Sequence, residues 1–210
     1  MYAAKGQGRN HYRFFSPRMN AELNEWIDLN ASMRLALENQ EFELHYQPKA
    51  SLTTGDLGGM EALIRWRHPE KGLISPARFI PVAEKSGLIG AIGNWVLQEA
   101  CRQIRLWLDA GIDPGRVAVN LSAVQCRSGR LDEQIAETLA KYGLTGFHLE
   151  VEITESIVMN DAEESIRAFW GLRDMGVRVV VDDFGTGYSS LSYLKRLPVD
   201  GLKVDKSFVD

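Results

Sequence analysis

Alternation of helix-like and strand-like segments is the feature that most limits the fold of this chain. Amphipathic helical segments end at Gly111, Gly143 and Gly176, where glycine is a common helix terminator. Short apolar runs follow at residues 116–122, 148–156 and 177–183, and a short helix at 190–198 leads to another run at 201–208. Because parallel strands need a crossover, usually a helix, this pattern predicts a parallel sheet with right-handed connections.

The first part of the predicted sheet is different. A helical period runs from Met19 to Asn39, and alternating polarity then predicts a strand from residue 41 that closes at Pro48. The turn-like sequence TTGDLGG separates it from a second strand at 58–66, which predicts a hairpin. Six strands result, whereas a closed (β/α)8 barrel has eight. The pattern leaves open a doubly wound sheet or a barrel without its last two units.

Composition limits the class of protein. The 210 residues are 45% hydrophobic, which suits one globular domain with a sizeable core, and a net charge of −4 argues against a nucleic acid polymer as partner. Neither Cys101 nor Cys126 has metal-type spacing, so both are predicted to be buried small hydrophobes in a reducing compartment. The chain shows no secretory signal and no apolar stretch long enough to cross a bilayer. We therefore expect a cytoplasmic domain, whose parent protein could still be tethered to a membrane.

Polar side chains gather at the ends of the predicted strands. In folds with parallel strands, the carboxyl ends of the strands carry the active site. The residues found there are Glu61, Arg65, Asn120, Glu152, Glu155, Asp182, Asp183, Lys203 and Asp205. Since alternate residues of a strand face the same side, most of this polar set is expected to point inward and converge. The opposite set, which includes Val151, Ile153, Leu202 and Val204, suits packing against helices.

A divalent cation explains such a gathering of acids. Several carboxylates in one place of low dielectric cannot all stay ionised unless positive charge joins them. The candidate ligands Glu61, Asn120, Glu152, Asp182 and Asp183 offer only oxygen atoms, which favours Mg²⁺ or Mn²⁺ over zinc.

The adjacent acids Asp182 and Asp183 raise the question of a second ion. In a regular strand they point to opposite sides, so each could serve one of two ions only if the backbone bends. Gly185 and Gly187, just beyond, make such bending cheap. Two neighbouring ions would clamp the attacking and leaving oxygens of a phosphoryl displacement.

Plainer interpretations stay open for several residues. A single acid at a strand end usually only begins a solvated loop, and Lys203 could be a structural ion-pair partner rather than a catalytic group. Arg65 could cap a helix or pair with Glu155. The four histidines, His11, His45, His68 and His148, lack metal-ligand spacing and are interpreted as surface or core polar groups.

The same residues stand in motifs that resemble the EAL domain family, the cyclic di-GMP phosphodiesterases. The motifs are YQP at 46–48, EALIRW at 61–66, NLS at 120–122, EITE at 152–155, DDFGTGYSSL at 182–191 and LKVDKSF at 202–208. They occur in the family's order and spacing over residues 20–210. The resemblance implies an α/β fold, a TIM-like (β/α)8 barrel with an antiparallel first strand, truncated here after about six strands. It also implies hydrolysis of cyclic di-GMP to linear pGpG with Mg²⁺ or Mn²⁺, as two ions.

The resemblance also assigns roles to individual residues. Glu61, Asn120, Glu152 and Asp182 match metal ligands, and Asp183 matches the contact to the second ion. Lys203 matches the residue that orients or deprotonates the attacking water, with a purely electrostatic role as the alternative, and Glu155 matches a glutamate that steadies the loop after Asp183. Substrate contacts are expected from Gln47, Leu63, Arg65 and Asp205, with Arg65 at a phosphate.

The ends of the chain suggest a larger parent protein. Residues 1–16 resemble the tail of a GGDEF (diguanylate cyclase) domain, which leaves 17–210 for the EAL domain and implies GGDEF and sensor domains upstream. EAL domains often pair, so a homodimer is expected. The family's last two strands carry EGVE-like and QGY-like motifs that this sequence lacks. Two alternatives to a phosphodiesterase therefore stand: a catalytically impaired module that binds cyclic di-GMP, or a non-functional fragment.

Overall fold

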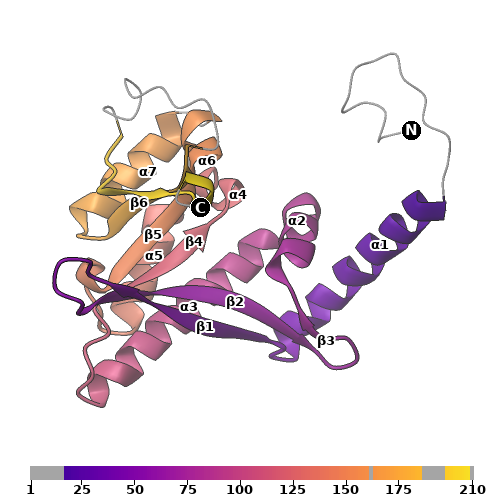
Figure 1. Cartoon of the computed structure of the whole chain (residues 1–210), viewed down its shortest axis with the longest axis horizontal. Coiled ribbons are helices and arrows are strands. Elements are labelled where there is room, and N and C mark those ends of the chain that lie inside the picture. Colours follow the sequence, from indigo (N-terminus) through magenta and orange to yellow (C-terminus); the bar gives the residue numbers. More distant parts are fainter. Residues whose placement is uncertain (1–16, 161–162, 186–196, 209–210) are drawn as a thin grey trace.

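A mixed β-sheet organises the molecule in the computed structural model, which describes residues 17–160, 163–185 and 197–208 (Figure 1). Its strands are β1 (Phe42–Ala50), β2 (Leu57–His68), β3 (Gly72–Ile74), β4 (Arg116–Leu121), β5 (Leu149–Thr154), β6 (Arg178–Phe184) and β7 (Gly201–Val204). The order is β1-β2-β4-β5-β6-β7, and β3 pairs with β2. The hairpin of β1 and β2 is antiparallel and every pair from β2–β4 to β6–β7 is parallel, as the alternation predicts.

A helix precedes the sheet, and further helices lie between β3 and β4, β4 and β5, and β5 and β6. They are α1 (Pro17–Glu38), α2 (Pro76–Ser86), α3 (Ile89–Asp109), α4 (Ala123–Cys126), α5 (Leu131–Lys141), α6 (Glu155–Asn160) and α7 (Glu163–Asp174), with 3-10 turns at Gly146–His148 and Lys206–Phe208. The N-terminal end of helix α1 points away from the sheet (Figure 1). The described residues thus form an α/β fold whose first strand is antiparallel.

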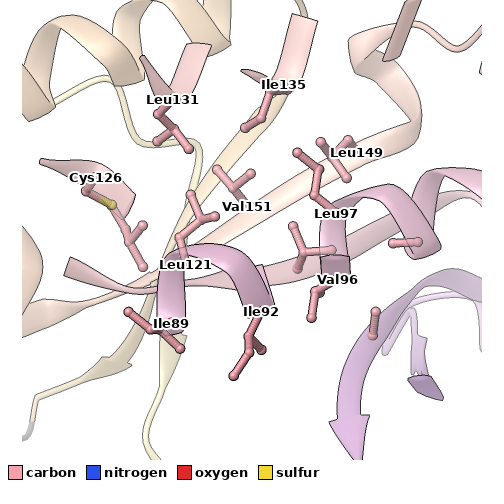
Figure 2. Close-up of a cluster of buried hydrophobic side chains, with 14 of the residues drawn as sticks. Ile89, Ile92, Val96, Leu97, Leu121, Cys126, Leu131, Ile135, Leu149 and Val151 are labelled. Carbon is pink, nitrogen blue, oxygen red and sulfur yellow. The ribbon is translucent and has the colours of Figure 1, made fainter. Parts of the chain in front are cut away.

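The core lies between the sheet and the crossover helices. Figure 2 shows Leu149 and Val151 of β5 facing Val96 and Leu97 of α3 and Ile135 of α5. Val151 and Ile135 are fully buried. Burying an aliphatic side chain of this size contributes about 1.5–3 kcal/mol, so this face holds the helices on the sheet.

The two cysteines belong to this core. Cys101 and Cys126 both carry buried thiols. Their sulfur atoms pack as small apolar groups. The prediction of two buried hydrophobic cysteines is confirmed.

Several local predictions differ from the structure. Strand β1 does not close at Pro48 but continues through it, with Pro48 opposite Met60. Since β1 is first in the strand order, a residue without an N–H is tolerated there. The short strand β3 was not predicted, and the predicted helix at 190–198 includes residues 190–196, which lie outside the described residues.

The last strand is also shorter than predicted. It ends at Val204, and a 3-10 turn follows. Leu202 and Val204 are exposed rather than packed under helices, because β7 stands last in the described strand order. None of the helices that the structure describes combines the length and the hydrophobicity of a membrane span.

Candidate metal centre at the strand ends

Three carboxylates from three strands meet at one place. Glu61 extends from β2, Glu152 from β5 and Asp182 from β6. One oxygen of each lies within 4.8 Å of the others. The parallel register explains the meeting, because strand ends at one edge of a sheet place residues of equal parity side by side. Glu152 is buried, whereas Glu61 and Asp182 are half-buried.

The ammonium group of Lys203 lies among these acids. Its Nζ donates hydrogen bonds to Glu152 Oε2 at 2.6 Å, Asp182 Oδ2 at 2.9 Å and Glu61 Oε2 at 3.1 Å. Burial alone lowers the pKa of Lys203, but the hydrogen bonds to Glu152 and Asp182 outweigh burial and raise it. In the structure Lys203 is therefore an ion-pair partner of the three acids, as the plainer interpretation of this residue predicts.

Asn120 and Glu152 complete the oxygen-rich face. The two residues lie directly opposite each other in the β4–β5 ladder. The Asn120 Nδ2 donates to Glu61 Oε1 at 2.9 Å, which leaves the amide oxygen as a further donor atom for a cation. Burial raises the pKa of Glu152, against the opposing effect of Lys203. A buried carboxylate in this state requires positive charge beside it.

The backbone bends at Asp183 itself. Asp183 has φ +53°, and the β6–β7 register shifts between Val181 and Phe184. Its N–H donates to Asp182 Oδ1 at 2.9 Å. Partial burial and the charges of Asp182 and Asp205 raise the pKa of Asp183. The left-handed φ of Asp183 and the register shift beside it show a backbone bend, which is the condition under which Asp182 and Asp183 could serve separate ions.

Glu155 ties the following loop to the sheet. Its carboxylate Oε2 accepts a hydrogen bond from the Gly185 N–H at 2.8 Å, and its side chain is buried at the start of α6. Arg65 does not pair with Glu155 in the structure. The Arg65 guanidinium donates instead to the Ile64 carbonyl oxygen at 2.9 Å.

A cleft opens near the strand ends, and its lining includes none of Glu61, Glu152 and Asp182. It has a volume of about 520 Å³, and its lining includes Leu63, Arg65 and Asn120 among mostly apolar residues of α2 and α3. Gln47 and Asp205 are not part of that lining. Gln47 is opposite Glu61 in the β1–β2 ladder, and Asp205 accepts hydrogen bonds from the N–H and hydroxyl of Ser207.

Sequence reasoning missed Lys49. Its Nζ donates to Glu150 Oε1 at 2.7 Å and to Glu152 Oε1 at 2.6 Å. The available signal was strand parity, since Lys49 continues the polar side of β1 that includes His45 and Gln47. Ending the predicted strand at Pro48 hid that signal.

The residues present fit a hard divalent cation. The donor atoms are carboxylate and amide oxygens, and three of the carboxylate oxygens lie close enough together to share one ion. The buried carboxylate of Glu152 is compensated by the ammonium groups of Lys203 and Lys49, which shows that this place accepts positive charge. Glu61, Glu152 and Asp182 are therefore a group that could hold a divalent cation.

Comparisons with family models and with known proteins point to the same family. Residues 30–210 match the model of the EAL domain. The chain is 51% identical over 210 residues to the bifunctional diguanylate cyclase/cyclic di-GMP phosphodiesterase MucR of Pseudomonas aeruginosa, covering all of this chain and 31% of that protein. It is 42% identical over 209 residues to the cyclic di-GMP phosphodiesterase PdeR of Escherichia coli, again covering 31% of the relative. The chain thus spans less than a third of these relatives' length.

Solved structures show the same architecture. A complex of the PaMucR phosphodiesterase with c-di-GMP superposes with a TM-score of 0.82 at 50% identity, covering 87% of this chain and 74% of that one. The FimX EAL domain from Pseudomonas aeruginosa bound to c-di-GMP gives a TM-score of 0.79 at 26% identity, with 87% and 73% coverage. Both likenesses extend over most of the present chain.

Proposed function

Because the chain belongs to the EAL domain family, we propose that it hydrolyses one phosphodiester bond of cyclic di-GMP and releases linear pGpG. The observation that carries the proposal is the convergence of Glu61, Glu152 and Asp182. Relatives named as cyclic di-GMP phosphodiesterases, 42–51% identical to this chain, support it. Retention of this acidic group favours hydrolysis over simple binding of the dinucleotide.

We propose two ions, Mg²⁺ or Mn²⁺, at the strand ends. Glu61, Asn120, Glu152 and Asp182 would hold the first, and Asp183 would contact the second. When bound, such ions supply Lewis-acid chemistry and neutralise phosphate charge. The bend at Asp183 supports this division, because it removes that side chain from the regular alternation of β6.

Two residues of the chain have proposed roles in the reaction itself. Lys203, whose Nζ contacts all three acids, would orient the attacking water, and it would deprotonate that water only once bound cations lower the pKa that the acids raise. Glu155 would keep the loop after Asp183 in place through Gly185.

Substrate binding is proposed at the cleft. Arg65 would bind a phosphate of cyclic di-GMP, and Leu63 would contact the dinucleotide from the same wall. Gln47 and Asp205 are proposed as further contacts, although in the structure they lie outside the cleft lining. Guanidinium groups pair well with phosphate oxygens, which suits Arg65 to this role.

The parent protein is proposed to contain more domains. A relative of this chain is named as a bifunctional diguanylate cyclase/cyclic di-GMP phosphodiesterase and extends well beyond the matched region, which supports a GGDEF domain upstream. We also propose that EAL domains of two copies pair.

Turnover tests the function directly. The purified chain is incubated with cyclic di-GMP and Mn²⁺, and pGpG is measured by chromatography. We expect product from the parent, product from Glu137→Ala, which removes an exposed acid of α5, and at least a hundredfold less from Glu61→Ala, as losses of catalytic groups commonly give. Equal rates for Glu61→Ala and the parent would contradict the site.

Calorimetry separates hydrolysis from binding. Titration with cyclic di-GMP is carried out in Ca²⁺ and in Mn²⁺. Heat of binding in Ca²⁺ together with no pGpG in Mn²⁺ would replace the phosphodiesterase by a binding module. No heat with either ion would remove both functions.

A further inference from the structure

The carboxylate of Glu152 is held by two lysines, one at each oxygen. Lys203 Nζ lies 2.6 Å from Oε2, and Lys49 Nζ lies 2.6 Å from Oε1. The side chain of Glu152 is fully buried. Each oxygen therefore has its own donor, and the plane of the carboxylate is fixed from both sides.

Only one of these lysines belongs to the acidic group. Lys203 also contacts Glu61 and Asp182, the other two members of the candidate metal centre. The second contact of Lys49 is Glu150 Oε1 at 2.7 Å, two residues before Glu152 on the same face of β5. Lys49 thus belongs to a second layer of charge further from the strand ends.

The second layer is itself anchored. The Glu150 carboxylate is 8% exposed, and its Oε2 lies 3.5 Å from Arg178 Nη1. Burial alone lowers the pKa of Lys49, but its hydrogen bonds to Glu150 and Glu152 outweigh burial and raise it. Lys49 reaches this place from β1, across the sheet from β5, so it links the antiparallel first strand to the strand that carries Glu152.

A cation at the strand ends would compete with Lys203 for Oε2 of Glu152. It would not compete with Lys49, whose contact is at the other oxygen. An oxygen that accepts a hydrogen bond from a lysine is a poorer ligand for a cation than the other oxygen of the same carboxylate, because the nearby ammonium repels the cation. The geometry therefore sets which oxygen of Glu152 is available and in which direction it points.

We propose that Lys49 is a positioning residue for the metal centre: it binds Oε1 of Glu152 and presents Oε2 alone to the cation held with Glu61 and Asp182. The role of Lys49 in the reaction rests on the proposed function. Its test depends only on cation binding at the metal centre. Groups that orient a metal ligand commonly change metal affinity 10- to 100-fold when they are removed.

The sign of the effect distinguishes positioning from charge. Lys49→Met removes a positive charge beside the metal centre, so electrostatics alone predicts tighter cation binding. Freeing Oε1 for a second metal bond also predicts tighter binding. Positioning predicts weaker binding, because Glu152 would then turn away from the direction that the cation requires.

The experiment measures Mn²⁺ affinity without cyclic di-GMP. Free Mn²⁺ is followed by electron paramagnetic resonance during titration of the full chain and of four variants. These are Lys49→Met, Lys49→Arg, the double variant Lys49→Met/Glu150→Gln, and Lys141→Met as a control lysine whose Nζ donates to Gln98. The double variant removes one charge of each sign, so it keeps the local balance of charge and remains informative if Lys49→Met does not fold.

We expect Mn²⁺ affinity to fall about 10- to 100-fold in Lys49→Met and in the double variant. Lys49→Arg should restore most of it, since arginine can also donate to both acids, and Lys141→Met should equal the parent. Unchanged or tighter binding in the double variant overturns the inference, as does a parent chain that binds no Mn²⁺. If the Mn²⁺ affinities follow the expected order but the parent chain forms no pGpG, the proposed function is overturned and this inference stands.

Discussion

The buried carboxylate of Glu155 accepts a hydrogen bond from the Gly185 N–H at 2.8 Å. Glu155 begins α6, whereas Gly185 follows β6, so one hydrogen bond joins two neighbouring strand ends of the sheet. The segment from Asp183 to Gly185 is therefore held at both ends: the Asp183 N–H donates to Asp182, and the Gly185 N–H donates to Glu155.

Replacing Glu155 tests that connection. Glu155→Ala leaves the Gly185 N–H without this acceptor, which costs about 1–3 kcal/mol when a buried group is left unpaired. We expect a lower urea midpoint and faster hydrogen exchange at the Gly185 amide. The exposed Glu137→Ala should change neither. Equal exchange at Gly185 in the Glu155 variant and the parent would mean that another group holds the loop.

The backbone of Asp183 adopts a conformation that residues other than glycine rarely adopt. Its φ of +53° is left-handed, and partial burial together with nearby acids raises its pKa. Asp183→Gly should raise the free energy of unfolding of the cation-free chain by about 0.5–1 kcal/mol, because it removes both strain and repulsion. Asp183→Asn, which removes only the charge, should give a smaller gain. Destabilisation by Asp183→Gly would show that the aspartate side chain stabilises the bend.

Lys203 neutralises the acidic group in the absence of cations. Lys203→Met should lower the free energy of unfolding by about 2–3 kcal/mol, somewhat less than for a fully buried pair because the lysine side chain is 32% exposed. Mn²⁺ should then raise the melting temperature of Lys203→Met more than that of the parent, since the cation replaces the missing charge. The same increase in both proteins would argue that Mn²⁺ binds elsewhere.

The thiol of Cys101 gives a pH dependence. Burial raises its pKa from 9.0 to about 12, so between these values the unfolded chain has released a proton that the folded chain keeps. Stability from this group is complete below pH 9 and is lost as pH rises toward 12. Between pH 8 and 10.5 the parent should lose about 2 kcal/mol more unfolding free energy than Cys101→Ala. Urea unfolding at both pH values measures this, and parallel losses in the two proteins would contradict it.

Strand parity carried most of the information about the site. Glu61, Glu152, Asp182 and Lys203 could be placed on one face because side chains alternate along any strand, and the structure brings them together. The glycines that end α3 and α5 were equally readable, since left-handed residues after helices favour glycine. Lys49 carried the same parity signal but was left out, because the predicted strand ended at Pro48; its two acidic partners became evident only in the assembled sheet.

The sequence by itself determined the strand–helix alternation, the polar face of each strand and membership of the EAL domain family, because all three are written in local periodicity and in motifs. Tertiary structure decided how the charges are shared: Lys203 among three acids, and Lys49 between Glu150 and Glu152. It also placed a left-handed residue at Asp183 itself, before the positive φ of Gly185. The physical reason is that hydrogen bonds between distant strands depend on distances that arise only once the sheet has assembled.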